Sequence, residues 1–289
     1  MAFSGHSSGG VYHIACRPPA IHSPAQPLPL PLKHPLVSDV IDLRVFYTSQ
    51  LGTVARRMVS RAIRTHWPSA RGMTTVGLGY CTPYLGLFRD EPDRSLAFMP
   101  AQQGVIHWPT ARPCRSVLVE DHMLPLPDAA VDRLIIVHAL EVSNDVQALL
   151  AEAWRVLAAG GRVLAVVPNR RGLWAQRDNT PFGQGRPYSA RQLTELMRQS
   201  SFTPVAWSQA LWVPPLKKSL ILGSAIAWER MGSALSLPFA GVHLVEATKQ
   251  VYRPAAVRRE DSVRIFRPVL QPTPAAREQT VMRHPGVSP

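Results

Sequence analysis

A helix, a glycine pair and an apolar strand follow one another between residues 146 and 167, and this unit most constrains the fold. Six apolar residues recur at the spacing of one helix face: Val146, Leu149, Leu150, Ala153, Trp154 and Leu157. Gly160 can take the left-handed conformation that ends a helix, because it lacks a β-carbon. Residues 163–167 are an unbroken apolar run, typical of a strand covered on both faces. The pattern predicts part of a doubly wound α/β sheet.

Further strand and helix signals alternate along the chain on both sides of this unit. We expect strands over residues 73–78, 95–99, 116–119, 134–138, 204–213 and 242–252. We expect helices near residues 51–64, 85–88 and 190–199, and Ser189 with Gln192 fits a capping box for the last one. Such alternation predicts a mostly parallel sheet. The last two strands are expected to form an antiparallel pair at the sheet edge, with a helical excursion between them.

Length and composition favour one domain with an extension at each end. A chain of 289 residues with 46% hydrophobic content can bury one large core. Residues 1–37 are rich in proline, and residues 254–289 are rich in proline and arginine, so we expect both to be disordered. The expected domain spans residues 38–253, with core motifs over 72–170 and further elements over 171–253.

The sequence predicts neither a targeting signal or membrane span nor a site built from cysteines. The sequence does not begin with a cationic stretch followed by an apolar one, which argues against a secretory signal. The longest apolar region, residues 216–241, is interrupted by Glu229 and Arg230, which argues against a membrane span. We therefore expect a cytoplasmic protein. Three cysteines lie far apart without paired spacing, so neither a disulfide framework nor a metal site is predicted.

The formal charge of +13 raises the question of a polyanionic partner. Residues 43–89 contain no acidic residue, and Arg56, Arg57, Arg61 and Arg64 fall on one predicted helix with an apolar opposite face. The favoured interpretation is the solvated face of a helix that packs against the sheet. The alternative is a surface for RNA or anionic lipid.

Two segments carry a resemblance to a known family. Residues 152–164 read E-A-W-R-V-L-A-A-G-G-R-V-L, which resembles the E-x-x-R-V-L-x-P-G-G-x-L motif of class I S-adenosylmethionine-dependent methyltransferases. Residues 119–132 resemble the family's G-D-A-x-x-L-P-F-P-D-x-S-F-D segment, including its proline-aspartate turn. The resemblance covers about residues 72–170 and is nearest to the methyltransferase type 11 group. It implies a Rossmann-like, mostly parallel seven-stranded sheet with an antiparallel edge strand, and S-adenosyl-L-methionine as cofactor.

The resemblance also implies a cofactor loop after the first strand. Thr75 aligns with the family's acid, Gly77 and Gly79 align with the first two glycines of its G-x-G-x-G loop, and Cys81 replaces the third. The family uses glycine there because the backbone passes close to the methionine part of the cofactor. The loop does not fit a dinucleotide fingerprint, since Thr82 stands where G-x-G-x-x-G needs glycine.

Two further cofactor positions follow from the resemblance. Met99 falls where the second strand of the family ends in a carboxylate that binds the ribose hydroxyls, and Gln102 or Gln103 could accept one hydroxyl instead. A neutral acceptor forms a weaker bond than a carboxylate. Glu120, with Asp121 beside it, matches the acid that binds the adenine amino group.

Catalytic and acceptor residues are less defined. Methyl transfer gains much of its rate from alignment, so a dedicated catalytic residue is optional. His138, at the end of the central strand, is a candidate general base, although a structural role is the favoured interpretation. Asn169, Arg170, Arg171 and Trp174 follow the next strand and form a loop suited to anchoring an anionic or planar acceptor.

Three functions therefore stay open. The first is a methyltransferase that transfers a methyl group from S-adenosyl-L-methionine to an unidentified acceptor. The second is a catalytically inactive relative that acts as a binding or scaffold protein, which Cys81 and Met99 suggest. The third is an RNA-binding methyltransferase that uses the basic helix from Arg56 to Arg64.

Overall fold

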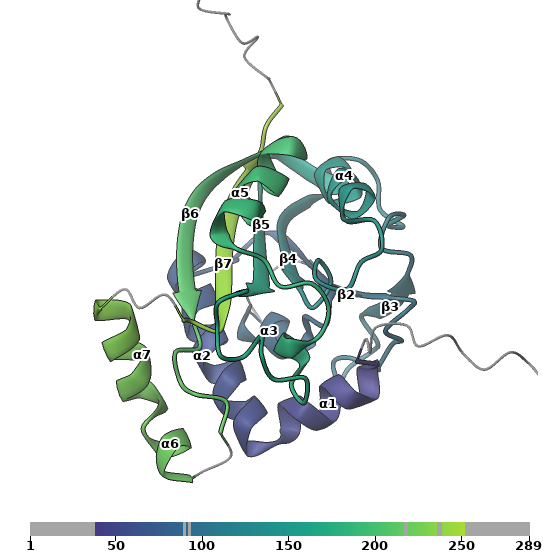
Figure 1. The fold of residues 1–289 in the computed structure, drawn as a ribbon. Helices are drawn as coiled ribbons and strands as arrows, with labels where there is room; N and C mark the ends of the chain where they lie inside the picture. The colour runs from purple at the N-terminus through teal and green to yellow at the C-terminus, as the bar shows by residue number, and fades with distance from the viewer. Residues whose placement is uncertain (1–37, 89–90, 92–93, 217–218, 236–238, 252–289) are drawn as a thin grey trace, which may run out of the picture. The chain divides into compact units, whose positions relative to one another are not determined.

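A seven-stranded mixed sheet forms the centre of the computed structural model (Figure 1). The structure describes residues 38–88, 91, 94–216, 219–235 and 239–251. The strands are β1 (Thr74–Gly79), β2 (Arg94–Pro100), β3 (Ser116–Val119), β4 (Val131–Val137), β5 (Leu157–Pro168), β6 (Phe202–Ala210) and β7 (Val242–Lys249). Their order in the sheet is β3-β2-β1-β4-β5-β7-β6. The first five strands are parallel, and β7 runs antiparallel to both β5 and β6. The predicted fold class is confirmed.

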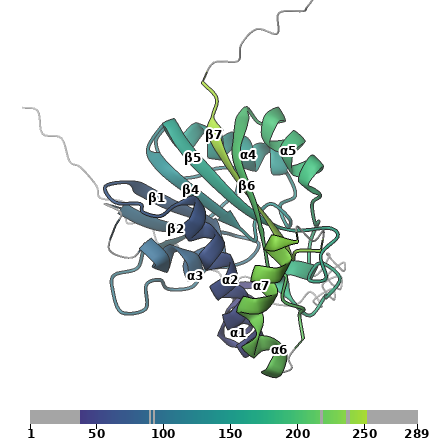
Figure 2. The same ribbon diagram turned by 90° about the vertical axis from the view of Figure 1, so that its left-hand side faces the viewer.

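Helices cover both faces of the sheet (Figures 1 and 2). They are α1 (Val40–Thr48), α2 (Gln50–His66), α3 (Thr82–Leu85), α4 (Val146–Val156), α5 (Ala190–Gln199), α6 (Ser219–Gly223) and α7 (Ala225–Ala234), with short 3-10 helices η1 (Gly86–Phe88) and η2 (Pro181–Gly183). Ile135 and Val137 pack in one core with α1, α2 and α3, whereas Leu134 and Ile136 pack in a second core with α4 and α5. Coverage on both faces explains why residues 134–137 of β4 are all apolar and buried.

The unit at residues 146–167 forms as predicted except at its turn. α4 ends at Val156, because Leu157 is already extended (φ −70°, ψ 135°) and pairs with Val131 of β4. Gly160 does adopt a positive φ of 74°, but it lies inside β5, where the pairing with β4 shifts register. The prediction that Gly160 caps the helix is therefore wrong. The predicted buried strand over residues 163–167 is confirmed.

The basic helix is α2, and its amphipathic character is confirmed. Leu51, Ala55, Met58, Val59 and Ile63 are buried in the core. Arg56, Arg57 and Arg61 are exposed on the other side, whereas Arg64 binds Glu91 at 2.9 Å. This matches a solvated helix face packed on the sheet. The alternative of an RNA surface stays a prediction.

Helix α1 was not predicted. It begins after Asp39, whose side chain accepts hydrogen bonds from the backbone N–H groups of Ile41 and Asp42, each at 2.8 Å. This is an N-cap of the common kind, and α1 leads through Ser49 directly into α2. The capping box of α5 is present as predicted.

Several expectations concern residues beyond those described. The predictions for residues 1–37 and 254–289, and for Cys16, lie outside the described residues. Within the described ranges, none of the helices is long and apolar enough to cross a bilayer.

Candidate functional site

The carboxyl ends of β1, β2, β3 and β4 meet at one edge of the sheet, and helix α1 and the loop around η2 border the same edge. In open α/β sheets, ligands bind in the crevice outside these strand ends. This region, called here the carboxyl edge, contains most of the residues that the sequence predicted for cofactor binding. Its centre is polar but closed, and its flank is open.

A hydrogen-bonded chain of side chains lies at the centre. The Tyr47 hydroxyl from α1 is 2.7 Å from Nε2 of His138 and 2.9 Å from the hydroxyl of Tyr84. Nδ1 of His138 is 3.1 Å from Oε1 of Glu141. All four side chains are buried. We call Tyr47, His138 and Glu141 the relay, because a proton could pass along them.

One arrangement of protons satisfies the contacts of the relay in the following way. If Nδ1 of His138 donates to the Glu141 carboxylate, then Nε2 accepts from the Tyr47 hydroxyl. Burial and the neighbouring Tyr84 raise the pKa of Tyr47 well above its ordinary value, so the phenol keeps its proton. His138 also has a positive φ of 54°, which is uncommon for a side chain of this kind. Strain of this type is often found where a side chain must point at a ligand.

Aromatic rings close the space around the relay. Tyr80, which follows the glycine loop, stacks on Tyr47 with ring centroids 5.5 Å apart. Phe182 from η2 lies 4.9 Å from the His138 ring, and Trp174 packs edge-on against Phe182. Tyr80 and Phe182 are almost fully buried. With α1 in this position, the centre of the carboxyl edge is therefore filled by the chain's own side chains.

Two buried acceptor atoms beside the relay have no hydrogen-bond partner among the described residues. They are Oε1 of Gln103 and Oε2 of Glu141. Gln103 holds the region together through other atoms: its side-chain amide donates to the carbonyl of His138, and its own carbonyl accepts from the backbone N–H of Val40 at 2.7 Å. Because buried polar atoms are normally paired, these two oxygens are the places where a ligand could donate.

The predicted glycine loop lies at the end of β1. Gly79 has φ 90°, and a β-carbon there would be 2.2 Å from the carbonyl oxygen of Val137. At Gly77, a β-carbon would be 2.4 Å from that of Cys81. Both glycines are thus required by the chain's own packing. Thr75 is buried on β1, and its hydroxyl has no partner within the described part of the chain.

Cys81, at the place of the third glycine, is a buried structural thiol. Its Sγ donates to the carbonyls of Leu78 at 3.1 Å and Ile135 at 3.2 Å. Burial raises the pKa of this thiol well above its ordinary value, so it stays protonated. The departure from the family's glycine therefore reflects packing at the base of the loop.

The other predicted cofactor residues divide between the core and an open flank. Met99 is fully buried in the core beneath α1, α2 and α3. Glu120 and Asp121 line a cavity of about 290 Å³ together with Gln102. Asp121 accepts a hydrogen bond from the Ser143 hydroxyl at 2.7 Å, and Glu120 is exposed. The flank has acceptors for an adenine amino group and for a ribose hydroxyl, although the ribose acceptor is an amide.

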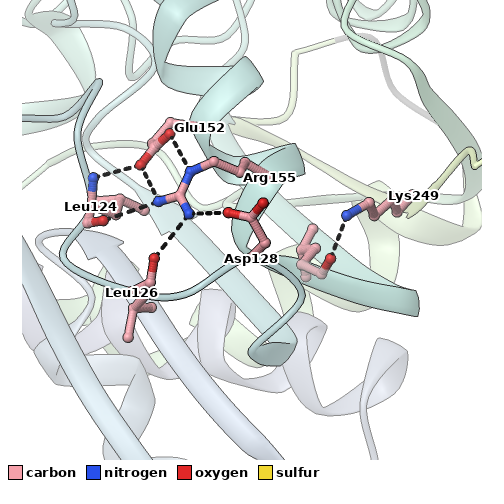
Figure 3. Close-up of polar contacts among 7 residues, drawn as sticks. Leu124, Leu126, Asp128, Glu152, Arg155 and Lys249 are labelled. Atoms are coloured by element: carbon pink, nitrogen blue, oxygen red, sulfur yellow. Dashed lines mark hydrogen bonds and ion pairs between the residues drawn. The ribbon is translucent and has the colours of Figure 1, made fainter.

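An arginine holds the loop that carries these acids (Figure 3). Arg155 on α4 binds both carboxylate oxygens of Glu152 and one of Asp128. It also donates to the carbonyls of Leu124 and Leu126. The glutamate and arginine of the helix motif therefore fix the proline-aspartate turn between β3 and β4.

The predicted acceptor loop after β5 is partly structural. Asn169 is buried, and its amide donates to the carbonyl of Ala240 at 2.8 Å. Trp174 is fully buried and donates to the carbonyl of Val213 at 2.8 Å. Arg170 and Arg171 are exposed. Trp174 lies close to the relay, because it packs against Phe182, which contacts His138. Among the described contacts, none places Arg170 or Arg171 next to the relay.

A second cavity lies beside the relay. It has a volume of about 540 Å³ and lies between α1, the loop around η2 and residues 215–216. Asp42, Phe46, Arg177 and Asp178 are among its lining residues. Phe46 packs against both Tyr47 and Phe182, so this cavity is one aromatic layer away from the relay.

Sequence reasoning missed Tyr47, Tyr84 and Glu141. Glu141 follows His138 by three residues, so its proximity could have been inferred. Tyr47 could not, because α1 was not predicted and its contact with His138 joins distant parts of the chain.

A cofactor of the expected kind would meet two different surroundings here. The flank at Glu120 and Asp121 has the hydrogen-bond acceptors that its adenosine half requires. The loop at Gly77 and Gly79, expected next to its methionine half, is followed by Tyr80, whose ring stacks on Tyr47. On that side of the carboxyl edge, aromatic side chains of the chain itself fill the space.

Comparisons with known proteins find similarity to methyltransferases. Residues 96–165 match the methyltransferase domain family of type 11. A Mycolicibacterium smegmatis protein, named a probable S-adenosylmethionine-dependent methyltransferase, is 38% identical over 81 residues. These residues are 27% of this chain and 31% of that protein, so the match spans about a third of the relative's length.

Two solved structures share the fold. A S-adenosylmethionine-dependent methyltransferase from Archaeoglobus fulgidus has a TM-score of 0.51 at 16% identity, covering 72% of this chain and 98% of that one. A chain from the complex between the Haloferax volcanii Trm112 methyltransferase activator and a protein named as a methyltransferase has a TM-score of 0.53 at 17% identity, covering 74% and 100%. The predicted resemblance to class I methyltransferases is confirmed.

Proposed function

We propose that this chain, which resembles class I S-adenosylmethionine-dependent methyltransferases in sequence and fold, transfers a methyl group from that cofactor to an unidentified acceptor. One observation carries the proposal. The matched residues 96–165 contain both the acids of the open flank and the arginine that fixes their loop. A family motif that is present in the sequence and also fixes the loop of a cavity lined by acids supports a cofactor site in this chain.

Residues of the open flank and of the glycine loop at the end of β1 would hold the cofactor. Glu120 and Asp121 would accept from the adenine amino group, and Gln102 would accept from a ribose hydroxyl. The backbone at Gly77 and Gly79 would lie beside the methionine part. The bound cofactor supplies an electrophilic methyl group, and the protein has to align an acceptor with it.

The relay supplies a general base for that acceptor. Nε2 of His138 is held by Glu141 on its far side and points at a phenol hydroxyl, the Tyr47 hydroxyl. An acceptor hydroxyl or amine in the same place would lose its proton to Nε2 as the new bond forms. The cavity of about 540 Å³ beside Phe46 would hold the part of the acceptor away from its reacting group, with Asp42, Arg177 and Asp178 among the lining residues.

Calorimetric titration of the full-length protein with S-adenosylhomocysteine tests the proposal, with NAD as the control ligand. We expect saturable binding of the first and none of the second. Ligand at 100 times its Kd would stabilise the fold by about 2.7 kcal/mol, which a thermal melt detects. A protein that binds neither ligand at millimolar concentration contradicts the proposal as stated.

The filled centre favours a second candidate, a non-catalytic relative that binds a partner. The Tyr47→Ala variant separates the two, because it removes the ring stacked on Tyr80. If the natural protein does not bind S-adenosylhomocysteine but the variant does, then α1 closes a working site. If neither binds, the scaffold function gains.

A variant of the relay tests whether His138 acts as a general base. Once an acceptor is known, His138→Ala is expected to lower the rate of methyl transfer by about 10²- to 10⁴-fold, the usual contribution of a general base. Binding of S-adenosylhomocysteine should persist. His107→Ala is the control, because His107 is exposed and outside the carboxyl edge. Equal rates for both variants would show that His138 has only a structural role.

The cytoplasmic location expected from the sequence stays a prediction.

A further inference from the structure

A second set of residues with catalytic geometry lies away from the carboxyl edge. Nε2 of His66, the last residue of α2, is 2.7 Å from the Ser208 hydroxyl on β6. Nδ1 of the same ring is 3.2 Å from Oε2 of Glu246 on β7. We call these three residues the triad. They form the sequence of nucleophile, base and orienting carboxylate that activates a serine hydroxyl.

The carboxylate of the triad is firmly held. Oε1 of Glu246 accepts from Nη1 of Arg162 at 2.8 Å and from the indole N–H of Trp67 at 3.0 Å. Burial raises the pKa of Glu246, but the hydrogen bonds from Arg162, Trp67 and His66 outweigh it and lower the pKa overall. The ionised carboxylate therefore accepts the Nδ1–H of His66. The lone pair on Nε2 then faces the Ser208 hydroxyl.

The serine is accessible. Ser208 lines a cavity of about 210 Å³ between α2, β6 and α7. Met58, Trp212 and Ile226 give the cavity apolar walls, and Arg61 and Arg230 also line it. Figure 2 shows α2 and α7 next to each other on this side of the sheet. None of the residues that line this cavity belongs to the relay or to the acidic flank.

We propose that the triad is a second catalytic site, which hydrolyses small carboxylic esters with Ser208 as nucleophile. Oγ of Ser208 would attack the acyl carbon while its proton moves to Nε2 of His66. The bond from the acyl carbon to the alcohol oxygen would break, and the alcohol would take that proton. Water would then attack the acyl-serine, giving the carboxylic acid and restoring Ser208.

The cavity limits the substrate. Its volume is below the range usual for drug-sized ligands, so the acyl group is short. The apolar walls suit an alkyl chain. Arg61, Glu229 and Arg230 all line the cavity, so an arginine is available to stabilise the developing oxyanion, and two arginines against one carboxyl group would favour an ester carrying a negative charge.

A purely structural role for the same three residues makes different predictions. As a clamp, they would join α2 to β6 and β7 through hydrogen bonds, and the serine would react no faster than any other. Covalent labelling distinguishes the two roles, because it measures the reactivity of the hydroxyl and not the stability of the fold.

The experiment treats the full-length protein with a fluorophosphonate probe and maps the modified residue by peptide mass spectrometry. We expect one modified serine, Ser208, and a burst in the hydrolysis of p-nitrophenyl acetate. Ser208→Ala should abolish both, and His66→Ala should slow labelling by at least about 100-fold. Ser233→Ala is the matched control, since Ser233 lines the same cavity on α7 without a histidine partner in the described contacts.

Several results would overturn the proposal. They are no labelling of the natural protein, equal labelling of Ser233, or an unchanged rate in His66→Ala. Ser208→Ala removes a single hydroxyl and keeps the His66–Glu246 contact, so we expect it to fold, with a melting temperature lowered only by the loss of one hydrogen bond. That variant alone decides the question if His66→Ala does not fold. The labelling and the ester hydrolysis do not depend on binding of S-adenosylhomocysteine.

Discussion

At the residue scale, two glycines with positive φ differ in their surroundings. Gly79 (φ 90°) lies against the carbonyl of Val137, whereas a β-carbon on Gly160 (φ 74°) would have no atom within 4 Å. Gly160→Ala is expected to lower the free energy of unfolding by about 1–2 kcal/mol through backbone strain. Gly79→Ala adds a collision and should lower it by about 3 kcal/mol or more. Urea unfolding measures both, and equal losses would contradict the role of the close contact.

His243 gives a prediction about pH. Burial lowers the pKa of this residue to about 4, from about 6.5 in an unfolded chain. The folded state favours the neutral ring, so the unfolded state takes up a proton first as the pH falls. The stability linked to His243 is complete above pH 6.5 and is lost between about pH 6.5 and 4, up to about 3 kcal/mol.

His243→Gln tests this linkage, because glutamine is neutral over the whole range. We expect the free energy of unfolding of the variant to fall less between pH 7 and 4 than that of the natural protein. His107→Gln, at an exposed position, should leave the slope unchanged. A slope that is the same in all three proteins would show that His243 does not titrate on unfolding.

Sequence reasoning located residues next to strand ends well and their distant partners poorly. Gly77 lies near the end of a predicted strand, Gly79 and Glu120 directly follow predicted strands, and Gly79 and Glu120 lie at the expected edge. Met99 also lies on its predicted strand, but its side chain faces the core, which a one-residue difference in register decides. The Tyr47–His138 contact joins residues 91 positions apart, and no local pattern encodes it.

At the scale of elements, Arg155 joins α4 to the loop that follows β3. Five of its contacts appear in Figure 3. Arg155→Lys keeps the charge but loses the planar fork that binds Glu152 through two nitrogens. We expect a loss of about 1–3 kcal/mol in the free energy of unfolding, the usual range for a partly buried charged hydrogen bond.

The matched control is Arg191→Lys, on the exposed side of α5. It should change the free energy of unfolding by less than about 0.5 kcal/mol. If S-adenosylhomocysteine binds, Arg155→Lys should also weaken that binding, because the loop carries Glu120 and Asp121. Unchanged stability and binding would show that the arginine is dispensable.

Elements with strong periodicity were predicted, and elements defined by tertiary contacts were not. Six apolar positions placed α4, and the capping box placed α5. The end of α4 was misplaced because pairing of Leu157 with Val131 overrides the helical signal. Helix α1 has only a short apolar pattern, and its position depends on contacts with Gln103 and His138.

At the scale of the whole molecule, the sequence predicts that one domain folds without the extensions. The compact unit of the structure ends at Val251. We expect residues 38–251, expressed alone, to unfold cooperatively at the same urea midpoint as the full-length chain. A lower midpoint would mean that residues outside this range stabilise the domain, and it would contradict the predicted boundaries.

The position of β7 has a consequence for synthesis. β7 is the last of the described strands in sequence, yet it lies between β5 and β6 and pairs with both. As the chain leaves the ribosome, β6 emerges before the strand that joins it to the sheet. Until β7 has been synthesised, the edges of β5 and β6 that pair with it stay unpaired. Unpaired strand edges are where nascent chains associate with one another. A premature stop before residue 242 would therefore yield an aggregating product, even though β1 to β5 had already been made.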